Sequence, residues 1–321
     1  MSNSNIKICV VGAGYWGKNH IRSLSELNSL GAVVESDKNQ IVEIKKNYPN
    51  IDIYEDIKEA IKNNDLIAFV VATPAETHFQ IALEIINARK HVLIEKPICL
   101  NEKDVNDLVE LSVEKNVRLM VGHLLLFHPA IKVIKELIDS GKLGKLQYIY
   151  SNRLNLGKVR TKENAFWSLA PHDISIFQHF TNSFPNSISA NGSTFLQPHI
   201  PDSTITQLKY SNGVEGHIYV SWLHPFKEHR LVVIGTNAMV TYEDSVNGKP
   251  LKLYSKKFDI NDGIPEKIDG PIYNLDYPDD QPLKEELSYF IKSINDKSLK
   301  IADGQHAIEV TKILVEASNQ I

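Results

Sequence analysis

The sequence predicts an α/β protein: an N-terminal doubly wound parallel sheet, followed by an α+β domain with a large, open and mainly antiparallel sheet. Three observations support this. A short apolar segment ends in a glycine-rich turn that opens a helix, and strand and helix patterns then alternate up to residue 122. Beyond that point, strand patterns follow one another directly. Alternation is typical of parallel sheets, whereas directly joined strands are typical of antiparallel ones.

The first strand and turn carry the clearest motif. The apolar segment Ile6–Val11 runs into Gly12-x-Gly14-x-x-Gly17, and Lys18–Leu24 has a helical pattern. Strand, tight turn and helix in that order are the context that a dinucleotide-binding fingerprint requires. Gly12 permits the turn, Gly14 lets the backbone approach a pyrophosphate, and Gly17 lets helix and strand pack closely. The helix N-terminus would then offer N–H groups to the phosphates.

The second strand, Gly31–Glu35, ends in an acid at the distance expected for ribose recognition. Glu35 can accept hydrogen bonds from both ribose hydroxyls and would repel the 2′-phosphate of NADP. We therefore expect NAD as the cofactor. In the alternative interpretation, Ser36 or Asp37 takes the strand-end position and Glu35 is merely solvated.

The remaining elements of the parallel sheet follow in order. Strands are expected at 66–72, 91–95 and 117–121, and helices begin near Asp56, Thr73 and Asn101. The continuous apolar run 66–72 is typical of a central strand buried on both faces. Thr73–Glu76 has the pattern of a capping box with Pro74 at the first helical position. In total we expect six strands, five of them at the ranges given, with interleaved helices.

The second half begins with a helix at 129–139. Strands are expected at 146–156, 203–210, 214–222, 230–234, 238–242 and 251–254, with Asn212-Gly213 as a type I′ turn, a surface loop at 261–280, and helices at 283–294 and 303–317. The expected domains are residues 1–123, which bind NAD, and residues 124–321, which bind substrate.

Composition sets limits on partners and compartment. The 321 residues have room for two domains, and the net charge of −4 favours neither nucleic acid nor a membrane as partner. No apolar run is long enough to span a bilayer, and residues 1–5 are polar without a signal-peptide core. Cys9 and Cys99 lack disulfide or metal-site spacing, so we expect a cytoplasmic protein without a metal.

The most informative strand end is Glu95-Lys96-Pro97. Ligands of open parallel sheets bind beyond the carboxyl ends of the strands, where this lysine lies. The proline restricts the residue before it and can adopt the cis form, which would aim the Lys96 side chain at one point. An ammonium there can hold a substrate hydroxyl, lower its pKa and receive or relay its proton. The alternative is a solvated turn lysine.

A second site is predicted at Trp167–Ser175, which opens a helix in the second domain. His172 is expected in its first turn, and a near-neutral imidazole suits proton acceptance from a hydroxyl. The alternative is a structural hydrogen-bonding histidine. His123, His128, His217 and His224 are expected to be structural, and His123, which directly follows the sixth strand, is the first to test.

Together these motifs resemble the Gfo/Idh/MocA oxidoreductase family. The resemblance rests on Gly12-x-Gly14-Tyr15-Trp16-Gly17, Ala72–His78, Glu95-Lys96-Pro97 and His172-Asp173, and it covers essentially the full length. It implies a Rossmann domain followed by an α/β domain whose open sheet forms homodimers or homotetramers, and Lys96 and His172 as the catalytic pair. The residues that it implies for NAD are Gly12, Gly14, Tyr15, Trp16, Gly17, Glu35, Ser36, Thr73, Pro74, His78, Glu95 and Lys96. Many members carry an aspartate four residues before the histidine, where this chain has Ser168. Lys96 and His172 would then have to divide the proton handling.

The expected substrate is a UDP-linked sugar. The segment 151–160, with Glu163, Asn164 and Trp167, is rich in anion-binding and hydrogen-bonding groups. The stretch 152–175 resembles UDP-N-acetylglucosaminuronate 3-dehydrogenases of surface-polysaccharide pathways. The residues expected to contact substrate are Lys96, Arg153, Asn155, Lys158, Arg160, Trp167 and His172. Arg153, Lys158 and Arg160 would suit a diphosphate and a uronate carboxylate, or else are strand-edge and surface charges.

The expected reaction is NAD-dependent oxidation of the C3 hydroxyl of that sugar. A rival interpretation is a nucleotide-ketosugar reductase that uses the same residues in reverse, which a preference for NADPH would favour and Glu35 argues against. A third interpretation is an inositol or sugar dehydrogenase of the same family, and a fourth is a non-catalytic nucleotide sensor. The presence of both Lys96 and His172 argues against the sensor.

Overall fold

The computed structural model describes residues 6–161, 163–296 and 298–321. These form two compact units that do not follow the chain as two blocks. The first holds the chain up to Phe127 together with Asp280–Thr311, and the second holds His128–Asp279 together with Lys312–Ile321.

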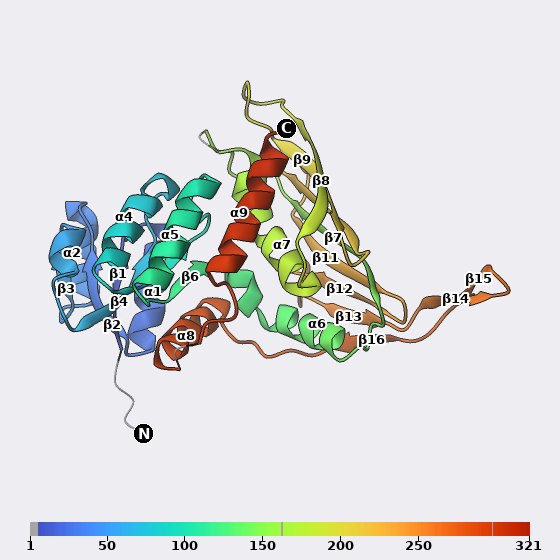
Figure 1. The fold of residues 1–321 in the computed structure, drawn as a ribbon, viewed down its shortest axis with the longest axis horizontal. Helices are drawn as coiled ribbons and strands as arrows, with labels where there is room; N and C mark the ends of the chain where they lie inside the picture. Colours follow the sequence, from blue (N-terminus) through green and yellow to red (C-terminus); the bar gives the residue numbers. More distant parts are fainter. Residues whose placement is uncertain (1–5, 162, 297) are drawn as a thin grey trace. The chain divides into compact units, whose positions relative to one another are not determined.

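The first unit is built on a parallel sheet (Figure 1). Its strands are β1 (Lys7–Val11), β2 (Leu30–Val34), β3 (Asp52–Tyr54), β4 (Leu66–Val71), β5 (His91–Glu95) and β6 (Leu119–Gly122). Within the described part of the chain they make one six-stranded sheet in the order β3-β2-β1-β4-β5-β6, with every pair parallel. The strand order reverses between β1 and β4, where doubly wound sheets bind their ligands. The predicted fold of this half is confirmed.

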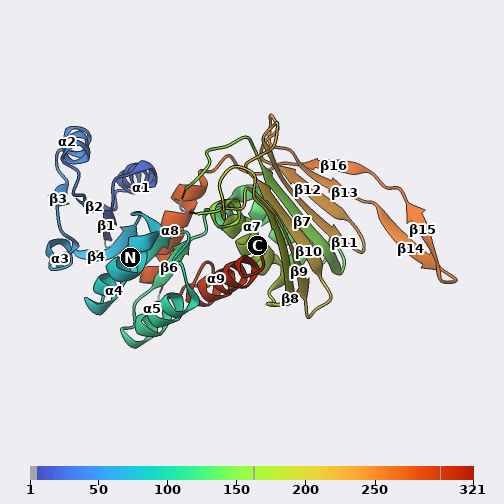
Figure 2. The ribbon, with the colours of Figure 1, turned by 90° about the horizontal axis from the view of Figure 1, so that it is seen from above.

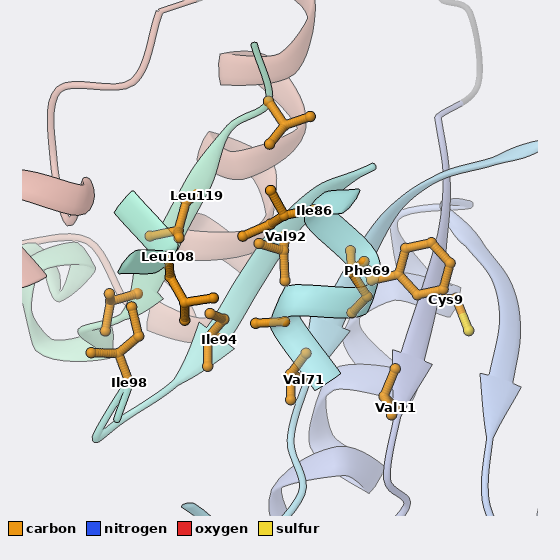
Figure 3. Close-up of a cluster of buried hydrophobic side chains, with 14 of the residues drawn as sticks. Cys9, Val11, Phe69, Val71, Ile86, Val92, Ile94, Ile98, Leu108 and Leu119 are labelled. Carbon is orange, nitrogen blue, oxygen red and sulfur yellow. The ribbon is translucent and has the colours of Figure 1, made fainter. Parts of the chain in front are cut away.

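Helices cover both faces of this sheet. They are α1 (Tyr15–Glu26), α2 (Lys38–Asn47), α3 (Ile57–Ala60), α4 (Ala75–Asn87), α5 (Glu102–Glu114), the 3₁₀ helix η1 (Leu124–Phe127), α8 (Pro282–Asn295) and the first part of α9 (Gly304–Ser318). On one face, Phe69 of β4 and Val92 of β5 pack with Ile86 of α4 and Leu108 of α5 (Figure 3). Successive strand residues point to opposite faces. Val70, on the other face, is also fully buried, which explains the continuous apolar run of β4.

Helix α8 belongs to this unit, although the expected boundary at 123/124 placed it in the second domain. Leu287 and Phe290 of α8 are completely buried, and the helix packs against α1 and η1 on the face opposite α4 and α5 (Figure 2). The amphipathic pattern of α8 shows that one side is buried, but the pattern cannot show which sheet buries it.

The second unit contains the larger sheet. Its strands are β7 (Leu146–Leu154), β8 (Pro185–Ser193), β9 (Ser203–Tyr210), β10 (Glu215–Ser221), β11 (Glu228–Gly235), β12 (Met239–Glu243), β13 (Leu251–Tyr254) and β16 (Ile272–Leu275). Among the residues described, the sheet has eight strands in the order β16-β13-β12-β11-β7-β10-β9-β8, and only β7 and β10 pair in parallel. The prediction of a mainly antiparallel sheet is confirmed.

Helices α6 (Pro129–Asp139) and α7 (Ala165–Thr181) accompany this sheet. Helix α7 packs against β7, β9 and β10. Residues along β9 alternate between buried and exposed, the pattern of a sheet with one face covered and the other open to water.

Two local expectations for this unit were wrong. The proposed loop 261–280 contains strands β15 (Ile264–Ile268) and β16, and β15 forms a hairpin with β14 (Lys257–Asn261), which directly precedes it. Asp262 and Gly263 both adopt positive φ, which closes a two-residue hairpin turn despite the polar composition. At 210–214 the loop is longer than a type I′ turn, because Tyr210 N donates to Val214 O and Gly213 takes positive φ. Strand β8 had not been predicted at all.

Reactive cysteines, membrane-spanning helices and metal-binding clusters would each indicate another kind of site. Cys9 and Cys99 are free and buried, and burial raises the pKa of the Cys99 thiol to about 12. In the parts of the chain that the structure describes, no helix is long and apolar enough to cross a membrane. Residues 6–161, 163–296 and 298–321 also contain no group of three or more histidine, cysteine or acidic side chains arranged to hold a metal.

Candidate active site

The glycine-rich turn has the geometry that its sequence predicts. Gly12 adopts φ +89°, and a Cβ on Gly17 would lie 1.9 Å from Gly12 O, so only glycine fits where helix and strand meet. Gly14 precedes α1 as its N-cap, is exposed, and has open space where a Cβ would stand. The turn therefore offers a bare backbone and a helix N-terminus, the combination that binds a pyrophosphate.

Glu35 follows β2 directly and reaches back to this turn. Its Oε2 accepts from Ala13 N at 2.7 Å, and its Oε1 accepts from Ser36 N at 2.8 Å and Asp37 N at 2.9 Å. Asp37 instead caps α2 by accepting from Asn39 N. The carboxylate beside the turn is thus that of Glu35, and recognition of the ribose by Glu35 stays a prediction.

The end of β4 is tied to the end of β5 by a buried histidine. His78 Nδ1 lies 2.9 Å from Pro97 O and its Nε2 lies 2.8 Å from Thr73 O, with the side chain almost completely buried. Thr73 is not the cap of α4, because Pro74 occupies the N-cap position and Thr77 Oγ1 donates to Pro74 O. His78 therefore sets the spacing of two strand ends that flank the predicted nicotinamide site.

The backbone of Lys96, directly after β5, is held in place by hydrogen bonds of the neighbouring Glu95. The Lys96–Pro97 peptide is cis. Lys96 N donates to Glu95 Oε2 at 3.2 Å, and the other carboxylate oxygen of Glu95 accepts from His20 Nε2 at 2.8 Å. His20 is fully buried on α1. The backbone that carries Lys96 is thus anchored through Glu95 to the helix that follows the glycine turn.

Two further buried titratable side chains, Glu286 and His123, lie near Glu95 and Lys96. Glu286 of α8 is fully buried, and neither carboxyl oxygen has a hydrogen-bond partner among the described residues. Burial, reinforced by the nearby Glu95 carboxylate, raises the pKa of Glu286 well above its usual range. His123 lies after β6, next to β5, and its Nδ1 is 3.0 Å from Nδ1 of His306. Burial, then His306 and Lys96, lower the pKa of His123 well below its usual range.

In the second unit, His172 is the eighth residue of α7 and not in its first turn as expected, because the helix already begins at Ala165. Asn164 caps this helix by accepting from Trp167 N, and Trp167 Nε1 donates to Ser318 Oγ at 2.7 Å. Pro171 lies inside the helix, directly before His172, and Ser175 Oγ donates to His172 O at 2.7 Å. The helix thus presents a half-buried imidazole at a point where proline interrupts the backbone ladder.

Arg153, which was expected to contact the substrate, is bonded to Asp173 of α7. Its Nε donates to Asp173 Oδ2 at 2.8 Å and its Nη2 donates to Asp173 Oδ1 at 2.9 Å. Both side chains are buried, with exposed fractions of 12% and 3%. Two of the three guanidinium nitrogens are therefore used within the protein, and substrate binding by Arg153 stays a prediction with a competing explanation.

The other residues expected to contact substrate lie between β7 and α7. Lys158 and Arg160 are exposed, and Arg160 Nε lies 3.6 Å from Glu163 Oε1. Asn155 Oδ1 is buried without a hydrogen-bond partner among the described residues. This segment leaves two cations and a buried amide oxygen with capacity for a ligand.

Comparison with protein families identifies the fold. The Gfo/Idh/MocA model, described as an oxidoreductase family with an NAD-binding Rossmann fold, matches residues 6–123, and the model of its C-terminal domain matches residues 131–241. The chain belongs to the Gfo/Idh/MocA oxidoreductase family. The matched family is one of oxidoreductases with an NAD-binding Rossmann fold, so NAD is the cofactor that the first unit is built to bind.

Individual relatives are diverse. A 4-carboxy-2-hydroxymuconate-6-semialdehyde dehydrogenase from Sphingobium sp. is 24% identical over 271 residues, 80% of this chain and 85% of its own. A myo-inositol 2-dehydrogenase from Thermotoga maritima is 24% identical over 225 residues, 66% of this chain and 67% of its own. Among solved structures, the UDP-N-acetylglucosamine 3-dehydrogenase GnnA from Acidithiobacillus ferrooxidans has a TM-score of 0.87 at 20% identity, covering 98% of this chain and 97% of its own. At that identity, the likeness to GnnA shows a shared fold.

The residues that the family resemblance implies are divided between the two units. The first unit brings the glycine turn, Glu35, Thr73, Glu95 and Lys96 to the carboxyl edge of its sheet. The second unit places His172 and Trp167 on α7, and Arg153 at the end of β7. The turn and Glu35 fit NAD, whereas the pairing of Lys96 with His172 stays a prediction.

The sequence prediction missed three residues in these sites. His20, Asp173 and Glu286 were given no role, yet each is completely or almost completely buried. A signal existed for the first two, because a histidine three positions after Gly17 and an acid beside His172 are unusual on buried helix faces. Glu286 offered none, since its neighbour Glu285 fits the same helix pattern.

Proposed function

We propose that the protein oxidises the C3 hydroxyl of UDP-N-acetylglucosaminuronate to the 3-keto sugar in the cytoplasm, for surface-polysaccharide synthesis. The observation that carries this proposal is the segment between β7 and α7. It offers exposed Lys158 and Arg160, and an Asn155 Oδ1 that has no hydrogen-bond partner in the part of the chain that the structure describes. Cations there suit a diphosphate and a carboxylate, and the amide oxygen suits an N–H or hydroxyl group of the sugar. The structural neighbour GnnA, described as a UDP-N-acetylglucosamine 3-dehydrogenase, supports a nucleotide-linked substrate.

The residues of this chain have distinct roles in the proposed reaction. Bound NAD supplies the hydride acceptor. The glycine turn and Glu35 hold that cofactor, and Lys96 and His172 bind the reacting hydroxyl and take up its proton. Family members with an aspartate at position 168 have a third proton acceptor, whereas Ser168 cannot carry a negative charge. The two remaining groups therefore share this task.

Kinetics on single variants test these roles. Lys96→Ala should leave NAD affinity nearly unchanged and lower turnover by roughly 10²–10⁴, the usual contribution of a positioned proton-transfer group. His172→Asn should also lower kcat with little change in KM, because its contribution arises only as the proton moves. A Lys96→Ala enzyme that retains more than half of the wild-type rate would show that Lys96 is only a turn residue.

Substrate choice is tested with UDP-N-acetylglucosaminuronate, UDP-N-acetylglucosamine and free myo-inositol. Neutralising Lys158 or Arg160 should raise KM for the uronate by about ten- to a hundredfold, since a lost charge-assisted contact costs on the order of 1.5–3 kcal/mol. Lys209→Ala, which removes an exposed lysine of β9, is the matched control. Equal rates with UDP-N-acetylglucosaminuronate and with uncharged UDP-N-acetylglucosamine would contradict the proposed contact with the sugar carboxylate. If inositol is the best substrate, the nucleotide-sugar proposal fails.

A further inference from the structure

The ion pair between Arg153 and Asp173 fastens helix α7 to strand β7 beside His172. Its two parallel N–H···O bonds, at 2.8 and 2.9 Å, form the fork geometry in which a guanidinium holds a carboxylate in one orientation. Asp173 directly follows His172, so fixing the Asp173 side chain fixes the backbone that carries the imidazole.

Among the described charged groups around Arg153, Asp173 is the one that it hydrogen-bonds. His229 of β11 is the cross-strand neighbour of Arg153, and Asp244 after β12 is the next acid near it. Asp244 forms an ion pair with Lys249, whose Nζ lies 3.0 Å from Asp244 Oδ1, and its Oδ2 lies 3.7 Å from His229 Nδ1. Tyr242 of β12 completes the surroundings. Asp173 is thus the acid bound directly to Arg153 in the described residues.

The backbone ladder of α7 lacks one hydrogen bond at this position. Pro171 has no N–H, so the bond that residue 171 would donate to the carbonyl of Trp167 is missing from the backbone ladder. The hydrogen bond from Ser175 Oγ to His172 O lies within the helix. The guanidinium fork adds a directed polar contact to the packing of α7 on the sheet, one residue after the imidazole.

A buried ion pair is a poor way to gain stability alone, because apolar residues of similar volume are often as good or better. It does provide a defined orientation. We propose that Arg153 and Asp173 are positioning residues for His172, and that Arg153 does not serve as a substrate clamp. This inference rests on the proposed catalytic role of His172.

The experiment compares Arg153→Lys, Asp173→Asn and the apolar double variant Arg153→Met/Asp173→Leu with wild type. Arg230→Met is the matched control, because Arg230 on neighbouring β11 pairs with Glu243 at 3.3 Å but is 39% exposed. We expect the double variant to fold and melt cooperatively, with KM within about twofold of wild type and kcat about 100-fold lower. That loss is typical of a reacting group displaced by about 1 Å. Arg153→Lys, which keeps one of the two bonds, should regain part of kcat.

A second readout does not need turnover. The His172 imidazole signal in proton–carbon NMR, assigned by its loss in His172→Asn, should shift in the double variant and in Asp173→Asn but not in Arg230→Met. A double variant with wild-type kcat and an unshifted signal would overturn the inference. So would a higher KM with unchanged kcat, which would make Arg153 a substrate ligand. If no sugar substrate turns over but the signal shifts as expected, the proposed function fails and the positioning of His172 stands.

Discussion

Glu286 should make the stability of the protein fall as pH rises. It is a fully buried carboxyl on α8 without a hydrogen-bond partner for either oxygen among the described residues. Burial, and then the Glu95 carboxylate, raise its pKa well above the ordinary value of 4.5. A raised folded-state pKa means that the native protein keeps a proton that the unfolded chain releases. The resulting stabilisation is complete below the unfolded pKa and is lost as pH rises toward the folded pKa.

The magnitude follows from linkage. Glu286→Gln removes the ionisation while keeping the shape and one buried polar group. Above about pH 4.5 the variant should gain stability over wild type by about 1.4 kcal/mol for each pH unit over which the folded wild type keeps its proton. The gain exceeds the few tenths of a kcal/mol typical of surface substitutions, so the two are easily told apart.

The assay is urea unfolding of both proteins at pH 5, 6 and 7. Hydrogen exchange of α8 peptides, measured in parallel, ensures that the transition of this unit is the one followed. Glu110→Gln, at an exposed position on α5, is the control and should show no such trend. A stability difference that is the same at all three pH values would refute the reasoning, because it would show that Glu286 does not hold an extra proton in the native state.

Two further predictions concern the cofactor unit. NAD(H) should bind more tightly than NADP(H), and Glu35→Ala should reduce the ratio of the two affinities by about ten- to a hundredfold, because hydrogen bonds to a charged group are worth on the order of 1.5–3 kcal/mol. Calorimetric titration of both cofactors measures this ratio. Equal or tighter binding of NADP(H) by the wild type would contradict this. Gly17→Ala should prevent NAD binding and lower the melting temperature, because its Cβ would lie 1.9 Å from Gly12 O. Gly14→Ala, whose φ is −65° and whose Cβ would meet open space, is the control for the melting temperature, and normal NAD affinity in Gly17→Ala would contradict the packing argument.

Much of the fold was predictable because its signals are local. The strand, turn and helix at Ile6–Leu24 are specified by contiguous residues, and the expected caps Asp56 and Asn101 do accept from Lys58 N and Asp104 N. Errors arose where local composition and local geometry disagree. The polar segment 257–268 forms a hairpin because Asp262 and Gly263 adopt positive φ, and composition alone does not reveal pairing between strands.

The sequence by itself determined the parallel sheet, the glycine turn, the acid after β2 and the lysine after β5, since each depends on residues within one strand–helix unit. Only the tertiary structure decided what the buried charges face. Arg153 meets Asp173 from 20 residues away and His20 meets Glu95 from 75 residues away. Glu286 is buried because α8 returns to the first sheet after the whole second sheet has been formed. Contacts of this kind depend on which faces pack together, and the spacing of residues along one element does not contain that information.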